Sequence, residues 1–297
     1  MLDSVRNDSR LASAAEKLLL LADVRGQLPT PVGQLIVAAG LVEPAESLLS
    51  DACIDQAPGY IAKKMRAVKG KVLALLDRQE REVHIRPDVS VNGPFKRLHE
   101  VGHHILPWQN DLAYVDDYYT LSPEVSARFE LEASRVAAEL LFQGDLLREH
   151  AATRRIRAKT VHDLSDDFGA TIHSTFRRYI ETHRKAVAGV VLERQPLCST
   201  PPCFERQEAF SSDIWLTQFH DPRHWPFRLG TGPFAAISSS ANDVASLLDA
   251  GAYMGPMRDT VEWPDLNGEL HSMRIEAFTN TYRLFVMLHP VRRVSAV

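Results

Sequence analysis

The sequence has few cysteines and no long apolar run. Three cysteines in 297 residues, Cys53, Cys198 and Cys203, are too few for a disulfide framework, and their odd number favours a reducing compartment. The longest nearly apolar runs, 18–22 and 186–192, are far shorter than the roughly 20 residues that a membrane helix needs. The first residues show neither the apolar segment nor the cleavage site of an export signal. We therefore expect a cytoplasmic protein without a membrane partner.

The composition also lacks a strong bias of charge or residue type. The 34 Lys and Arg residues and 38 Asp and Glu residues give a formal net charge of −4, so no general basic field attracts nucleic acid. An apolar content of 45%, with 15 Gly and 17 Pro, excludes collagen-like and low-complexity chains. At roughly 100 to 200 residues per domain, the length favours about two domains.

The pattern of apolar, turn and charged residues divides the chain into four regions. They are a helical lead-in over 1–60, a core over 61–150, a helical extension over 151–195 and a smaller C-terminal domain over 196–297. Alternating apolar residues in the last region predict strands near 214–219, 234–238, 273–278 and 284–289, and one helix near 242–250. We therefore expect an α+β fold, with helices and a small hairpin in the core and an α+β domain after it.

The core region begins with a predicted hairpin and a predicted helix. A polar tetrad at 77–80 separates two short runs, 71–76 and 82–85, which is typical of a β-hairpin. Pro94 opens a helix, because proline is favoured at the first helical position, and Pro107 ends it.

This helix contains the sequence H-E-x-x-H, from His99 to His103. Residues four apart on an α-helix are separated by about 400°, so both imidazoles lie on one face and can bind one metal ion. Glu100 points to the side, where it can act as the general base for an attacking water. His104 is rotated by about 100° from His103, so we expect it to pack or to face solvent. The alternative is a helix whose histidines and glutamate all pack or face solvent.

A second amphipathic helix, predicted from about 124 to 141, offers the third ligand. Its candidates are Glu124, Glu130, Glu132 and Glu139. Four- and three-residue steps place Arg128, Glu132, Arg135 and Glu139 on one charged face. We therefore expect Glu132 and Glu139 to face solvent. Glu130 lies at the edge of the buried face, where an unpaired carboxylate is costly unless a cation compensates it. Two histidines and one glutamate leave an open position, as in catalytic zinc sites.

Two stretches of the sequence resemble the ImmA/IrrE family of metallopeptidases. Residues 95–106, FKRLHEVGHHIL, match the family motif F-x-x-x-H-E-x-G-H-x-L, and residues 130–141, ELEASRVAAELL, match E-x-x-A-N-x-F-A-x-x-L-L. The resemblance covers roughly 25–190 and implies a zincin-like peptidase core in which Glu130 is the third Zn²⁺ ligand. It also implies site-specific cleavage of a helix-turn-helix repressor, which relieves repression of stress-response or mobile-element genes.

Two residues depart from the family pattern. Ser134 stands where the family usually has Asn or Asp, at a position expected to orient a ligand histidine through its other ring nitrogen, and a hydroxyl can accept that hydrogen bond. Gln143 stands where the family commonly ends the helix with Met-Pro. The reaction also needs a group that stabilises the oxyanion, and the sequence leaves four candidates open: Tyr114, Tyr118, Tyr119 and His150.

Residues 164–180 have the pattern of a helix, a turn and a helix. Nearby basic side chains could meet phosphate, namely Arg177, Arg178, Arg184 and Lys185. We favour a helical pair that supports the peptidase core, because the chain is acidic overall. The segment could instead dock the repressor, or bind DNA in a regulatory protein whose zinc is only structural.

The C-terminal region contains two further patterns. A second, structural zinc could be bound by Cys198, Cys203, His220 and His224. The wide gap between the two pairs and the surrounding prolines favour reduced loop cysteines instead. Three tryptophans, Trp215, Trp225 and Trp263, are expected to anchor the core or an interface of this domain.

Overall fold

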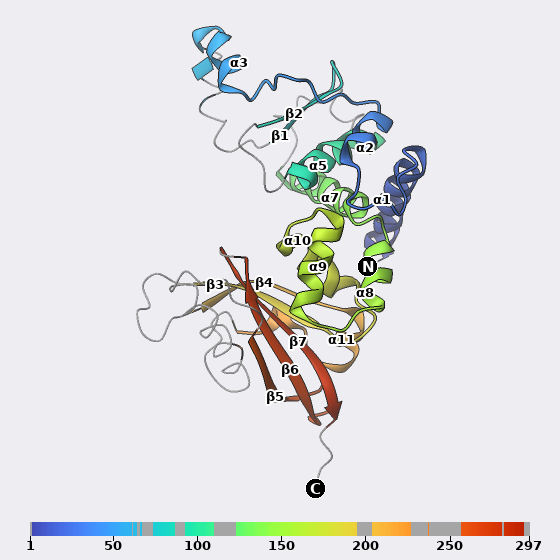
Figure 1. The fold of residues 1–297 in the computed structure, drawn as a ribbon, viewed down its shortest axis with the longest axis vertical. Coiled ribbons are helices and arrows are strands. Elements are labelled where there is room, and N and C mark those ends of the chain that lie inside the picture. The colour runs from blue at the N-terminus through green and yellow to red at the C-terminus, as the bar shows by residue number, and fades with distance from the viewer. Residues whose placement is uncertain are drawn as a thin grey trace. The chain divides into compact units, whose positions relative to one another are not determined.

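The computed structural model describes most of the helices and strands expected from the sequence. The described residues are 2–60, 62, 63, 66, 74–86, 93–109, 123–194, 204–226, 237, 257–280 and 282–293. They form two compact units (Figure 1). The first contains Met1–Leu146 and Asp166–Thr171, and the second contains Leu147–Ser165 and Ile172–Val297. Helices and antiparallel strands occur in both, so the α+β fold class is confirmed. No described helix is long and apolar enough to cross a membrane.

In its described residues, the first unit consists of helices and one small hairpin. Its named elements are α1 (Leu2–Leu21), α2 (Val32–Ala38), α3 (Asp51–Gln56), β1 (Ala74–Asp77), β2 (Glu82–Ile85), α5 (Gly93–Ile105) and α7 (Pro123–Leu141). β1 and β2 are antiparallel, with Ala74 opposite Ile85 and Asp77 opposite Glu82, so the predicted hairpin is confirmed. Val42 adds a parallel bridge to Glu82, which ties the helical lead-in to the hairpin.

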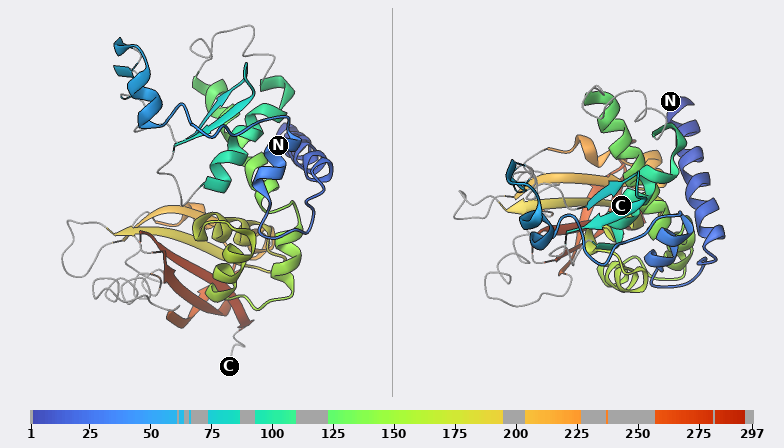
Figure 2. Two further views of the ribbon diagram at one scale, coloured as in Figure 1. Left: turned by 45° about the horizontal axis from the view of Figure 1, so that its top comes forward. Right: turned by 90° about the horizontal axis from the view of Figure 1, so that it is seen from above.

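α5 and α7 pack against each other in the first unit (Figure 2). Pro94 is the second residue of α5 and Pro107 follows its end, in agreement with the sequence prediction. Ala133 and Val136 of α7 are fully buried. A Cβ added at Gly102 would lie 2.8 Å from the carbonyl oxygen of Ala133, so glycine is needed for this close approach.

The end of α7 is held by Gln143, one of the two departures from the family pattern. Gln143 has a positive φ of 50° and its side chain is buried. The amide oxygen accepts the N–H of Gly26 at 2.7 Å, and the amide nitrogen donates to the carbonyl of Gln27 and to the hydroxyl of Thr30. The Thr30 hydroxyl donates in turn to the carbonyl of Leu141. Gln143 thus joins the end of α7 to the lead-in.

A five-stranded antiparallel sheet dominates the second unit. The named elements of this part of the chain are α8 (Leu146–Ala152), α9 (Ala158–Phe168), α10 (Ile172–Thr182), β3 (Ala188–Arg194), β4 (Phe204–Ser211), α11 (Asp213–Gln218), η1 (Pro222–His224), β5 (Met257–Pro264), β6 (Leu270–Thr279) and β7 (Leu284–Arg293). The strand order is β4-β3-β7-β6-β5. β6 and β7 confirm the strands predicted near 273–278 and 284–289.

α9 and α10 pack on one face of this sheet (Figure 1). The ring of Phe176 on α10 lies 5.6 Å from that of Phe278 and 5.3 Å from that of Phe285, both on strands. The N–H of Ala158, the first residue of α9, donates to the buried carboxylate of Glu276 on β6 at 2.7 Å. The predicted helix pair is present, and its apolar side packs on the C-terminal sheet.

The turn between α9 and α10 is the part of this pair that belongs to the first unit. Gly169 has a φ of 63° and makes the turn at the predicted place. The ring of Phe168 lies 5.9 Å from that of Phe142, at the end of α7. The sequence favoured packing of the whole pair on the core region. In the first unit only the turn packs at the end of α7, whereas the two helices pack on the sheet.

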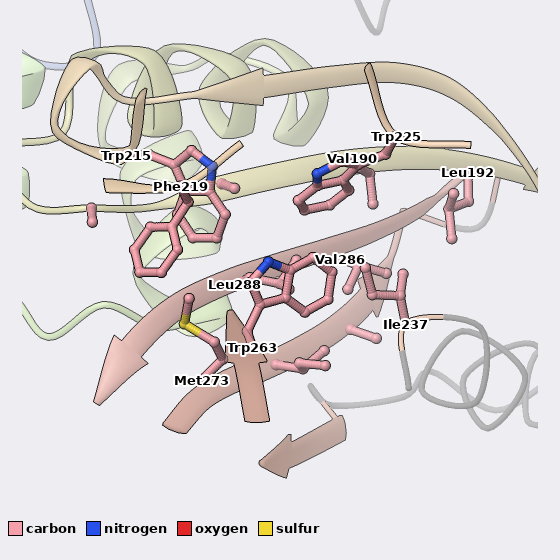
Figure 3. Close-up of a cluster of buried hydrophobic side chains, with 14 of the residues drawn as sticks. Val190, Leu192, Trp215, Phe219, Trp225, Ile237, Trp263, Met273, Val286 and Leu288 are labelled. Atoms are coloured by element: carbon pink, nitrogen blue, oxygen red, sulfur yellow. The ribbon is translucent and has the colours of Figure 1, made fainter. Parts of the chain in front are cut away.

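The other face of the sheet carries a cluster of buried aromatic and aliphatic side chains (Figure 3). The ring of Trp225 lies 5.1 Å from that of Trp263, and the ring of Trp215 lies 4.6 Å from that of Phe219. β6 contributes Met273, and other strands contribute Val190, Leu192, Val286 and Leu288. The tryptophans are thus core residues of the second unit, as the sequence indicated.

Two predictions for the C-terminal half are corrected by the structure. Residues 214–219, expected to form a strand, lie mostly in the helix α11. Ser212 caps this helix, because its hydroxyl accepts the N–H of Trp215. The boundary expected after residue 195 falls within the sheet, because β3 pairs with β4 on one side and with β7 on the other. Apart from Ile237, the strand predicted at 234–238 and the helix predicted at 242–250 lie outside the described residues.

Candidate metal centre

Three of the predicted ligands converge between α5 and α7. The Nε2 atoms of His99 and His103 lie 3.1 Å apart, and Glu130 places one carboxylate oxygen 3.1 Å from His99 Nε2 and the other 3.4 Å from His103 Nε2. Tetrahedral Zn²⁺ with ligand bonds of about 2.0–2.1 Å holds its ligand atoms roughly 3.3 Å apart. The donor types and their spacing therefore fit one zinc ion. Within the described part of the chain, no other group of His, Cys, Asp or Glu offers this convergence.

The local sequence explains the convergence. His99 and His103 are one helical turn apart on α5, and their rings meet edge to face with centroids 4.7 Å apart. Gly102 brings α7 close enough for Glu130 to reach both rings. The histidine side chains are 15% and 13% exposed and that of Glu130 is 49% exposed, so the three ligands lie at the surface of the first unit.

The electrostatics of the group favour an anionic Glu130. Hydrogen bonds with His103 and His99 hold the pKa of the Glu130 carboxyl far below its usual range. Burial alone would lower the pKa of His103, but the hydrogen bonds with Glu130 and Gln109, together with the negative charges of Glu130 and Glu100, raise it. Burial raises the pKa of Glu100, and the two neighbouring histidines offset part of this rise. The site thus combines one carboxyl group with a lowered pKa, Glu130, and one with a raised pKa, Glu100.

Two side chains contact the outward ring nitrogens of the histidines. The hydroxyl of Ser134 lies 3.3 Å from His99 Nδ1, the contact that its sequence position predicted. The Oε1 atom of Gln109 lies 2.8 Å from His103 Nδ1. Sequence reasoning missed Gln109, because this residue lies beyond Pro107 and outside both helical motifs.

Glu132 is buried, so the expectation that it faces solvent is wrong. Its side chain is 2% exposed, and its carboxylate accepts hydrogen bonds from Trp108 Nε1 at 2.8 Å, Gln109 Nε2 at 3.0 Å and Arg128 Nε at 3.0 Å. Two of these donors come from the segment after α5. Helical periodicity could not show them, because it describes only the neighbours along α7. Glu139, the other acid expected in solvent, is half-buried.

The remaining predicted residues lie elsewhere. His104 bonds to the backbone of Ala39 beside α2, and burial lowers its pKa, so it packs as expected. Glu124 is exposed at the start of α7. His150 is on α8, most of which is in the second unit. His220 and His224 are exposed in the second unit. Tyr114, Tyr118, Tyr119, Cys198 and Cys203 lie outside the described residues.

Comparisons with known proteins found a similar fold but no matching family. No protein-family model matches the sequence, and no curated protein matches it. Among solved structures, a "Mycobacterium tuberculosis transcriptional regulator" is similar, with a TM-score of 0.50 and 14% sequence identity over 95% of this chain and 76% of that chain. At this identity the likeness concerns the fold alone. Membership of the ImmA/IrrE family stays a prediction that rests on the two motifs.

Proposed function

We propose that this chain is a zinc-dependent endopeptidase that acts in transcription regulation by cleaving a helix-turn-helix repressor. The observation that carries the proposal is the convergence of His99, His103 and Glu130 in one group, with the partly buried Glu100 next to His99 in the same helix. Such a donor set with one open position is typical of catalytic zinc, whereas structural zinc sites are closed by four protein ligands.

Each residue of the site has a defined task in peptide hydrolysis. His99 and His103 hold the metal through Nε2, and Glu130 holds it through its carboxylate. Bound zinc supplies a Lewis acid that polarises the scissile carbonyl and makes water a stronger nucleophile. The Glu100 carboxylate takes the proton of the attacking water and delivers it to the leaving amine. Burial raises the pKa of Glu100, which makes its carboxylate a stronger base toward the proton of the attacking water.

Two observations support the substrate assignment. It rests on the resemblance of residues 95–106 and 130–141 to peptidases that cleave repressors, and on the similarity of the fold to a transcriptional regulator. Both point to gene control.

A regulatory DNA-binding protein with structural zinc is the second candidate, and the regulator-like fold favours it. Part of its basic segment is already engaged within the second unit, while Arg184 and Lys185 are exposed. Arg177 is paired with Glu181 at 3.0 Å, and the apolar side of the helix packs on the sheet. This candidate predicts salt-sensitive DNA binding by the intact chain, and an absence of binding at low salt would exclude it.

The test of the proposal is cleavage of the helix-turn-helix repressor encoded nearest to this chain's gene. Wild type, Glu100→Gln and the exposed control Glu80→Gln are each incubated with the repressor and Zn²⁺, and fragments are identified by intact mass. We expect cleavage by wild type and Glu80→Gln, and full zinc binding without cleavage by Glu100→Gln. Equal cleavage by Glu100→Gln would contradict the role of Glu100.

A further inference from the structure

The amide of Gln109 has only one orientation that satisfies its surroundings. Gln109 is 1% exposed, and its side chain lies between His103, Glu132 and the backbone of Phe129. The Glu132 carboxylate and the Phe129 carbonyl, 3.0 and 3.3 Å from the amide nitrogen, can only accept hydrogen bonds. The nitrogen of the amide therefore faces these two acceptors, and its oxygen faces His103.

This orientation determines which nitrogen of His103 carries a proton. The Gln109 oxygen lies 2.8 Å from His103 Nδ1 and can only accept, so Nδ1 must be the donor. In the neutral imidazole the other nitrogen, Nε2, then carries a lone pair. Nε2 is the atom that lies 3.1 Å from His99 Nε2 and 3.4 Å from the Glu130 carboxylate.

We propose that Glu132 and Gln109 form a hydrogen-bonded relay that fixes His103 in its Nδ1–H tautomer and so keeps Nε2 available as a metal ligand. This inference rests on the metal site of the proposed function. It makes Gln109 and Glu132 positioning residues, since neither lies among the three converging ligands. Buried hydrogen-bond partners of ligand histidines orient the ring and raise its basicity.

The far end of the relay is anchored by contacts that involve neither histidine. The Glu132 carboxylate also accepts from Trp108 Nε1 and from Arg128 Nε. Arg10 of α1 lies over the Trp108 ring, 4.2 Å from its centroid. His99 has no such support, because its Nδ1 contacts only the Ser134 hydroxyl, at 3.3 Å, in the hydrogen bonds described. The two ligand histidines are therefore held unequally, and His103 is the more rigidly oriented.

Zinc affinity of the full-length chain tests the relay. Wild type, Gln109→Leu, Glu132→Met and the exposed control Gln79→Leu are titrated with Zn²⁺ against a chromophoric chelator, and their folding is checked by circular dichroism. We expect Gln109→Leu to weaken binding about 10- to 100-fold and Glu132→Met to weaken it less, because the Phe129 carbonyl still orients the amide. We expect Gln79→Leu to bind as wild type does. Equal affinity of Gln109→Leu and wild type would overturn the relay.

Nitrogen NMR of the zinc-loaded wild type tests the relay independently, because it does not depend on whether a variant folds. In ¹⁵N-labelled protein, the relay predicts that His103 Nδ1 carries a proton while Nε2 shows the shift of a metal ligand. An unprotonated Nδ1 would overturn it. If wild type binds no zinc, the proposed function fails first. If wild type binds zinc and Gln109→Leu binds it equally well, only the relay fails.

Discussion

Replacing Gly102 by alanine is predicted to push apart the two helices that carry the metal ligands. The new Cβ would lie 2.8 Å from the carbonyl oxygen of Ala133 and 3.1 Å from its Cα. Ordinary contact begins at 3.4 Å, so the helices must separate by up to about 0.6 Å at this point. Both contacts are backbone atoms, which cannot rotate away as a side chain can.

The stability cost follows from two opposing effects. Overpacking of a tight interface costs about 1–3 kcal/mol, while alanine gains about 1 kcal/mol over glycine inside a helix. The net loss for Gly102→Ala is about 0–2 kcal/mol. Gly33→Ala on α2 is the matched control, because an added Cβ there meets nothing within 4 Å. It is expected to gain up to about 1 kcal/mol, so the two variants should differ by about 1–3 kcal/mol.

Amide hydrogen exchange in α5 and α7 measures this difference within the first unit. Zinc affinity provides the second reading, because a site displaced by about 0.5 Å loses its productive geometry. We expect Gly102→Ala to show faster exchange and weaker zinc binding than wild type. Protection and zinc affinity equal to those of Gly33→Ala would refute the argument that the close approach positions Glu130.

Three further predictions concern single side chains. Burial and nearby basic groups such as Arg274 lower the pKa of His289 to about 4, against about 6.5 in the unfolded chain. As the pH falls from 6.5 toward 4, the unfolded chain takes up a proton at this histidine and the folded chain does not, so the folded state loses stability over this range. Between pH 7 and 5, wild type should therefore lose about 2 kcal/mol more than His289→Gln in urea unfolding, and parallel pH curves would contradict this. Ser134→Ala should weaken zinc binding about 10-fold, because His99 Nδ1 loses its contact with the hydroxyl. Chelator competition measures the affinity, and an unchanged value would show that the contact does not orient the ring. Gln143→Leu should lower the free energy of opening at the end of α7 by about 2–3 kcal/mol, because the N–H of Gly26 loses its acceptor and the carbonyl of Gln27 loses its donor. Hydrogen exchange measures this free energy, and a loss below about 0.5 kcal/mol would contradict the prediction.

The helices of the metal site could be predicted because their signals are local. Pro94 and Pro107 bracket α5, and the small and apolar residues of α7 recur at helical spacing. The spacing of His99 and His103 then fixes their common face. Contacts between segments distant in the sequence could not be predicted from these local signals. Glu132 was misplaced because its position in a charged stripe indicated solvent, while its donors come from another segment.

The C-terminal sheet was harder to predict for two reasons. Residues of β3 such as Val190 and Val191 are buried on both faces, so the strand lacks the alternation that identifies half-buried strands. Residues 214–219 are rich in β-branched and aromatic side chains, which favour strands, yet they form a helix, because Ser212 supplies an N-cap and Trp215 anchors the first turn. The cap was visible in the sequence as a serine followed by Asp213, and it was the more reliable signal.

The most direct test of the zinc site is X-ray absorption at the zinc edge, on the full chain loaded with one Zn²⁺. A site made of His99, His103 and Glu130 predicts only nitrogen and oxygen neighbours at about 2.0–2.1 Å, with the multiple-scattering pattern of two imidazoles. The same spectrum is expected for Glu100→Gln, which keeps every ligand. Sulfur neighbours at about 2.3 Å would place the zinc on cysteines and contradict the account.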